Sequence, residues 1–209
     1  MGGPATLDLI VLAADKKIEA AVQGICRRGR SLGFSEISFK TRVHPRHDPG
    51  CLHEAHVALR PFASQFRHAI VVLDKEGSGK ESPPRVQIEA EIEAKLNASG
   101  WGDRAKVIVI DPELEAWIWS DSPHVAEALG WESGDKALRD WLVERGWCQA
   151  GSVKPTRPKE AYEAALQKVS ASQSASIYRR LAGKVGLTRC TDPAFMKLKT
   201  ILQEWFGVG

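Results

Sequence analysis

The chain has 209 residues, of which 43% are hydrophobic and 26% are charged, with a formal net charge of +3, as in ordinary soluble globular proteins. No stretch approaches the roughly 20 uninterrupted apolar residues of a membrane span, so we expect a cytoplasmic protein with no membrane contact. The four cysteines (Cys26, Cys51, Cys148 and Cys190) form no CxxC pair, which excludes zinc-ribbon spacing and favours reduced thiols in the core.

Strand patterns alternate with helix patterns in the first part of the chain. Four strands are predicted, at 7–13, 37–43, 68–73 and 107–110. The first, third and fourth are near-continuous apolar runs, as expected of strands buried on both faces, whereas the second alternates apolar and polar residues and is predicted nearer the edge. Helical spacing of apolar residues follows the first and third strands. This alternation predicts a doubly wound, mostly parallel α/β sheet.

Helical patterns dominate after Asp111. Helices are predicted near 123–129, 135–145, 158–169, 174–184 and 193–206. Ser122-Pro123 and Asp192-Pro193 each place an N-cap residue before a proline at the first helical position. We therefore predict an α/β domain over residues 1–120 and a basic helical subdomain over residues 121–209.

Carboxylates follow three of the predicted buried strands. They are Asp15 after the first, Asp74 and Glu76 after the third, and Asp111, Glu113 and Glu115 after the fourth. Ligands of open α/β sheets bind at the carboxyl ends of the strands. Carboxylates crowded there repel one another, and a hard cation relieves that repulsion.

These residues predict a site for Mg²⁺ or Mn²⁺. Asp74 and Glu76, two apart in an extended segment, would hold the ion, and Asp15 would complete the site or act as a base. Lys80 would steady phosphate charge, and Glu115 is a further candidate catalytic residue. Gly77 and Gly79 would let the backbone turn tightly.

Each acid also has a structural explanation. Asp15 would cap a helix that begins at Lys16. Asp111-Pro112 would begin another helix, with the following glutamates in its first turn. Asp74 and Glu76 would lie in a surface turn. The neighbouring GSGK stretch is no phosphate-binding loop, because the first glycine and the final hydroxyl of that motif are missing.

Four histidines occur in the segment HPRHDPGCLHEAH, together with Asp48 and Cys51. These side chain types bind zinc, but two prolines and a glycine interrupt the run and the spacing matches no zinc pattern, so zinc is not expected. The segment is either a polar surface loop or a source of a histidine that contacts phosphate or transfers a proton.

The C-terminal third is basic. Residues 148–209 hold ten Lys/Arg and four Asp/Glu, and the other 147 residues hold 19 bases and 22 acids. Candidate nucleic-acid contacts are Lys154, Arg157, Lys159, Arg179 and Arg180, which fall at predicted helix entrances or beside an aromatic residue. A solvated helical surface would have the same composition.

Several stretches carry a resemblance to a known family. They are DPGC at 48–51, IDPELEAWIWSDSPHV at 110–125, KPTRPKEA at 154–161 and CTDPAFMKLKTILQEWF at 190–206. The chain resembles the small protein component of bacterial methylation-associated anti-phage defence systems. The resemblance implies that the partners are other proteins of such a system, which restricts phage DNA. It supplies no reaction for this component.

The first half also looks like a topoisomerase-primase (toprim) fold, in which an acid follows the first strand and an Asp-x-Asp follows the third. Asp15 and the pair Asp74-x-Glu76 would take these places, with a departure in each. The resemblance implies a Mg²⁺-dependent domain that acts on phosphodiesters of DNA or RNA. The alternative is a non-catalytic adaptor or sensor that binds nucleic acid or a partner protein.

Overall fold

A four-stranded parallel sheet forms the centre of the protein in the computed structural model, which describes residues 6–120, 122, 124–132, 136–152, 154–184 and 190–207. The strands are β1 (Leu7–Ala13), β2 (Phe39–Val43), β3 (Phe66–Asp74) and β4 (Ala105–Ile110). They lie in the order β2-β1-β3-β4 with all pairs parallel. The predicted α/β fold is therefore confirmed, with β2 at an edge of the sheet.

The strand sequences account for this order. Residues 9–13 of β1 and 69–73 of β3 are at most 2% exposed, because these two central strands are covered on both faces. Edge strand β2 instead alternates half-buried and exposed positions. Apolar runs thus mark the centre of the sheet, and alternation marks its edge.

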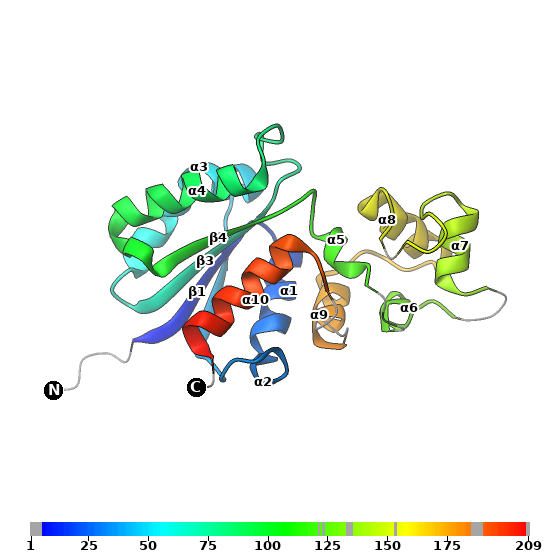
Figure 1. Ribbon diagram of the computed structural model, residues 1–209, viewed down its shortest axis with the longest axis horizontal. Helices are drawn as coiled ribbons and strands as arrows, with labels where there is room; N and C mark the ends of the chain where they lie inside the picture. The colour runs from blue at the N-terminus through cyan, green and yellow to red at the C-terminus, as the bar shows by residue number, and fades with distance from the viewer. Residues whose placement is uncertain are drawn as a thin grey trace.

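Helices cover both faces of the sheet. Figure 1 shows α1 (Lys16–Cys26) and α10 (Pro193–Phe206) on one face and α3 (His47–Leu59) and α4 (Arg85–Leu96) on the other. The remaining helices and turns are α2 (Gly29–Leu32), α5 (Glu115–Ile118), α6 (His124–Leu129), α7 (Leu138–Glu144), α8 (Pro158–Lys168), α9 (Ala175–Lys184), η1 (Arg60–Phe62), η2 (Asn97–Trp101) and η3 (Gly102–Arg104). Within the described ranges, no helix has both the length and the apolar character that crossing a membrane would require.

The direction of the connections reverses between the two central strands. Helix α1 leads from β1 to its neighbour β2, towards one end of the strand order, whereas α4 leads from β3 to β4, towards the other end. The chain therefore diverges from the carboxyl ends of β1 and β3. In doubly wound folds this divergence opens a crevice that serves as the ligand site.

Helix α3 was not predicted from the sequence. Pro49 and Gly50 lie in its first turn, where proline is tolerated because its missing N–H would have no partner within the helix. Glycine is required at position 50, because a Cβ atom there would lie 2.0 Å from the Nδ1 of His44. The histidine segment is thus a helix that packs on β1 and β3, and a surface-loop interpretation is wrong.

The helices predicted after β4 are present, and one predicted helix start needs correction. Asp192 caps α10 by accepting hydrogen bonds from the backbone N–H groups of Ala194 and Phe195, at 3.0 and 3.3 Å. Helix α5 begins at Glu115, so the interpretation of Asp111 as a helix cap is wrong. The predicted proline start of α6 falls on residue 123, which lies outside the described residues.

The last two helices return to the sheet. Helix α9 packs against α1, and α10 packs against β4. Gly24 permits the first contact, since a Cβ atom there would lie 2.7 Å from the Cβ of Ala182. The predicted boundary at residue 120 marks where the chain leaves the sheet, but only α6, α7 and α8 extend away from it (Figure 1). One cluster of buried side chains runs through both halves.

Side chains cover the free edge of β4. The carboxylate Oε1 atoms of Glu93 and Glu89 accept hydrogen bonds from the backbone N–H groups of Val107 and Val109, at 2.9 and 3.0 Å. Lys197 of α10 donates to the carbonyl of Val107 at 2.9 Å and to both glutamates. These groups occupy the positions that another strand would use, so strand addition at this edge is blocked.

Candidate functional site

Five carboxylates gather where β1 and β3 diverge. Asp15 follows β1, Asp48 lies in the first turn of α3, Asp74 ends β3, and Glu113 and Glu115 follow β4. Asp15, Asp48, Glu113 and Glu115 all lie close enough to Asp74 to raise its pKa. The structure therefore brings the predicted residues Asp15, Asp74 and Glu115 to one edge of the sheet, and it adds two acids to them.

Asp74 is the most unusual member of the group. Its Oδ1 atom is buried and has no hydrogen-bond partner among the described residues. Burial raises the pKa of this carboxyl well above its usual range, and the neighbouring carboxylates raise it further. An orphaned buried oxygen is destabilising unless a donor or a cation meets it.

Asp48 was not predicted as a site residue. Its Oδ1 atom accepts a hydrogen bond from the backbone N–H of Asp74 at 2.8 Å. Burial raises the pKa of Asp48, and the charge of Asp15 contributes in the same direction. The preceding residue, His47, has a positive φ of 50° and donates from Nδ1 to the carbonyl of Ala14 at 3.2 Å. This contact fastens the start of α3 to the end of β1. The available signal was the position of Asp48 soon after the second predicted strand.

Asp15 has the capping role considered from the sequence, and it also lies near the other carboxylates. Its Oδ1 atom accepts hydrogen bonds at 2.8 Å from the backbone N–H groups of Lys17 and Ile18, so it caps α1. Its other oxygen makes no hydrogen bond among the described residues. The cap thus fixes the orientation of Asp15 next to Asp48 and Asp74 while leaving one carboxylate oxygen available.

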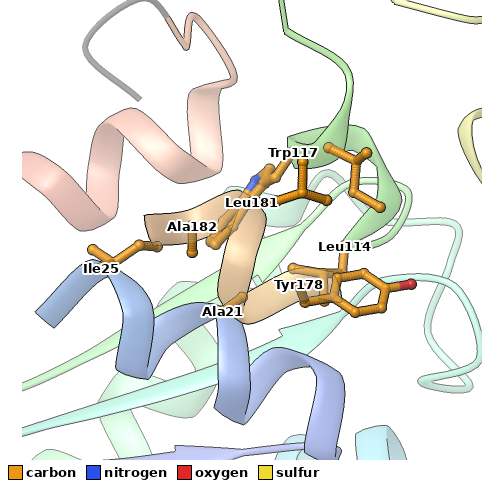
Figure 2. A pocket seen from close by; sticks show the side chains of 8 residues that line it. Ala21, Ile25, Leu114, Trp117, Tyr178, Leu181 and Ala182 are labelled. Carbon is orange, nitrogen blue, oxygen red and sulfur yellow. The ribbon is translucent and has the colours of Figure 1, made fainter. Parts of the chain in front are cut away.

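Glu115 is buried where α1, α5 and α9 meet. Tyr178 of α9 donates a hydrogen bond from its hydroxyl to Glu115, and the Nζ of Lys17 lies 3.7 Å from the same carboxylate oxygen. Figure 2 shows Tyr178 beside the apolar cavity between these helices, with its hydroxyl turned away from Ile25 and Ala182. The carboxylate is therefore compensated by its own partners and holds three helices together.

Glu113 and Glu76 lie on the outer side of the group. Glu113 is buried and pairs with Lys159 of α8 at 3.0 Å. Glu76 is exposed, and its charge acts on Glu113 and Lys159. The chain turns after Asp74 instead of staying extended, with φ of 77° and 85° at Gly77 and Gly79. Asp74 and Glu76 thus have different surroundings, and the expected tight turn at the glycines is present.

Neither lysine after β3 is associated with the buried carboxylates. Lys80 forms an ion pair with Glu91 of α4. Lys75 pairs with Asp111 at 2.9 Å on the rim. Of the five carboxylates that gather here, Glu115 is paired to Lys17 and Glu113 to Lys159. The other three, Asp15, Asp48 and Asp74, have no ion pair among the described residues.

The histidines of segment 44–56 form no metal cluster with these acids in the part of the chain that the structure describes. His44 is buried, and its Nδ1 accepts a hydrogen bond from the backbone N–H of Arg46 at 3.1 Å. Burial lowers its pKa, so His44 is a structural residue. In the parts of the chain that the structure describes, no three Asp, Glu, His or Cys side chains are close enough to hold a metal ion as they stand. Cation binding would require the unpaired carboxylates to turn towards one another.

The predicted nucleic-acid residues do not form one cationic surface. Lys154 pairs with the buried Asp192 at 2.8 Å, and Lys159 is held by Glu113. Arg180 donates to the carbonyl of Ala128 at 3.0 Å. Arg157 lies over the ring of Trp147, 5.1 Å from its centroid, and Arg179 lies 3.5 Å from the side chain of Gln23. Three of the five thus pair with a carboxylate: Lys154, Lys159 and Arg157, the last with Glu160 at 3.7 Å.

Comparison with known proteins identifies no relative. No family model matches the chain, and no curated protein and no solved structure matches it.

Proposed function

We propose that this protein is a divalent-cation-dependent enzyme that cleaves phosphodiester bonds of nucleic acid, as one component of an anti-phage defence system. The observation that carries the proposal is the buried, unpartnered oxygen of Asp74 at the switch point of the sheet. Asp15 and Asp48, which also have no ion pair in the described part of the chain, flank it.

The chemistry of these three residues suits a hard cation. Mg²⁺ and Mn²⁺ bind carboxylate oxygens. Asp74 would be the inner ligand, with Asp15 and Asp48 beside it, and Glu76 would reach the ion only from the exposed rim. When bound, the cation would polarise the phosphodiester and lower the pKa of a water molecule.

The chain's own residues would prepare the site for this reaction. Asp48 accepts a hydrogen bond from the backbone N–H of Asp74 at 2.8 Å, so it would hold the inner ligand in position. Lys80 and Glu115 are not assigned catalytic roles here, because their charges are compensated by Glu91 and by Tyr178 with Lys17.

The defence context is proposed from the sequence resemblance alone, together with the expectation that other proteins of such a system are partners. The alternative function is a non-catalytic adaptor that binds nucleic acid through the helical half. It has less support, because Lys154 and Lys159 are engaged by Asp192 and Glu113.

The experiment that tests the proposal combines calorimetric titration with Mn²⁺ and a nuclease assay on DNA and RNA. Wild type should bind Mn²⁺ and cut at least one substrate, and Asp74→Asn should lose both properties. Asp111→Asn is the matched control, since Asp111 also follows a strand but pairs with Lys75 on the rim; it should behave as wild type. A wild-type protein that binds no Mn²⁺, or a folded Asp74→Asn variant with unchanged activity, overturns the proposal.

The adaptor alternative makes the opposite prediction in cells that carry the whole system. There Asp74→Asn would keep phage resistance, whereas Ala substitutions at Lys154, Arg157 and Lys159 would lose it. Our proposal predicts that Asp74→Asn loses resistance.

A further inference from the structure

Two adjoining hollows lie at the opposite end of the sheet from the carboxylates, where α3 and α4 end and β3 begins. The first has a volume of about 880 Å³ and includes His56, Arg60 and Lys95 in its lining. The second, of about 770 Å³, includes Arg67 and Arg104. Ala63 and Ser64 line both hollows, so the two form one continuous surface.

The charged residues that line this surface are all basic. No Asp or Glu is among the described residues that line either hollow. The side chains of Arg60 and Lys95 are exposed and form no ion pair or hydrogen bond among the described residues. The side chain of Arg67 is 67% exposed, and its Nη1 atom lies 3.8 Å from the Oδ1 of Asp8, which is a long distance for an ion pair. A screened contact of that kind offsets little of the charge.

Arg104 links the backbone segments that form this surface. Its guanidinium donates hydrogen bonds of 3.0–3.2 Å to four backbone carbonyls, those of Ala63, Phe66, Arg67 and Gly100. It also lies over the ring of Trp101, 5.2 Å from the centroid. These partners line or border both hollows, and none is a carboxylate. Arg104 therefore holds the backbone around both hollows in place, and it has no ion pair among the described residues.

We propose that this double hollow, defined by Arg60, Lys95, Arg67 and Arg104, binds the phosphate backbone of a nucleic acid. Cations spread over two open, connected hollows match a chain of phosphates better than a single small anion, which would need an enclosed site. The hydroxyl of Ser64 lies between them as a neutral hydrogen-bond donor. Val57, 61% exposed in the first hollow, offers apolar contact to a base.

Charge distribution also separates this surface from the other large hollow. The hollow of the helical half, about 920 Å³ in volume, contains Lys136, Arg145 and Lys168 but also Glu132 and Glu144. Lys136 pairs with Glu144 at 2.7 Å, so the two acids there offset most of the attraction for a polyanion. The contrast supplies a control, because two cations can be reversed in each hollow with the same change in net charge.

The test measures fluorescence anisotropy of labelled 20-nucleotide single-stranded DNA, the same RNA, and duplex DNA, in EDTA so that no cleavage intervenes. Wild type should bind at least one of them with an affinity that falls as salt is raised. The Arg60→Glu/Lys95→Glu variant should bind at least about tenfold more weakly with a shallower salt dependence, since two phosphate contacts are lost. Arg60→Gln/Lys95→Gln should be intermediate, and it guards against misfolding of the reversed variant.

The controls distinguish this inference from the proposed chemistry. Lys168→Glu/Arg145→Glu should bind as wild type, because this change does not touch the double hollow. The inference is overturned if wild type binds none of the three probes at low salt, or if the reversed variant binds as wild type. It is equally overturned if both charge-reversal variants weaken binding to the same extent, which would show an effect of net charge alone. Loss of Mn²⁺ binding in Asp74→Asn would not bear on this inference, because the binding assay contains no free cation.

Discussion

The carboxylate of Asp48 accepts a hydrogen bond from the backbone N–H of Asp74 at 2.8 Å, and both carboxyl groups have raised pKa values. The bond joins the first turn of α3 to the last residue of β3. It also brings a second negative charge next to a carboxylate whose own Oδ1 atom is buried and unpartnered. The protein without a cation therefore carries an electrostatic cost at this edge of the sheet.

Removing the charge of Asp74 should stabilise the cation-free protein. Burial raises the pKa of Asp74 above that of the unfolded chain, which is about 4. Below pH 4 the carboxyl is protonated in both states, so Asp74→Asn and wild type should unfold alike. As the pH rises through the raised pKa, the folded wild type loses stability that the variant keeps. At pH 8 in EDTA, the variant should have a free energy of unfolding higher by about 1–3 kcal/mol.

Urea denaturation at several pH values measures this difference. Asp111→Asn is again the control and should show no advantage that grows with pH. A variant of Asp74 that is less stable than wild type across the whole range would mean that the carboxylate has a partner that stabilises it.

The hydroxyl of Tyr178 should be more important to stability than that of Tyr162, although both are buried. Tyr178 donates to the buried Glu115, whereas the Tyr162 oxygen has no hydrogen-bond partner in the described part of the chain. Tyr178→Phe should lower the free energy of unfolding by about 1–3 kcal/mol, because a buried carboxylate loses its donor. Tyr162→Phe should be neutral or slightly stabilising. Equal losses in thermal unfolding of the two variants would contradict this assignment.

The ion pairs on the edge of β4 should make a large contribution to stability. Lys197 contacts Glu89, Glu93 and the carbonyl of Val107, and Glu89 is only 3% exposed. Lys197→Met leaves Arg85 as the one cation paired with that carboxylate in the described part of the chain, and we expect a loss of about 3 kcal/mol. Lys199→Met, on the same helix, should change stability by less than about 0.5 kcal/mol. Calorimetric melting of both variants checks the prediction, which fails if they melt together.

The contact between α1 and α9 should depend on the absence of a side chain at residue 24. In Gly24→Ala the new Cβ would approach the Cβ of Ala182 to 2.7 Å, so α9 must shift and the contact of Tyr178 with Glu115 must adjust. We expect a loss of about 1–3 kcal/mol from overpacking, partly offset by better helix propensity. Combining it with Ala182→Gly should recover part of that loss. Strictly additive effects in the double-mutant cycle would contradict the close contact.

The sequence alone determined the α/β body and the end of the sheet at which the carboxylates gather. Strands buried on both faces must be apolar throughout, so their apolar runs, and the acids that end them at Asp15 and Asp74, are readable without coordinates. Helix α3 was not readable, because Pro49 and Gly50 suppress the helical pattern and only contact with His44 explains the glycine.

Only the tertiary structure decided which charges are free. Lys154 and Asp192 are 38 positions apart, and Tyr178 and Glu115 are 63 positions apart, so no local pattern relates them. Long-range packing neutralises Lys154, compensates Glu115 and leaves the Oδ1 atom of Asp74 without a hydrogen-bond partner in the described part of the chain. It also gathers Arg60, Lys95 and Arg67 from separate elements into one surface. Periodicity reports which face of an element is buried, whereas the charge balance of a site depends on which elements meet there.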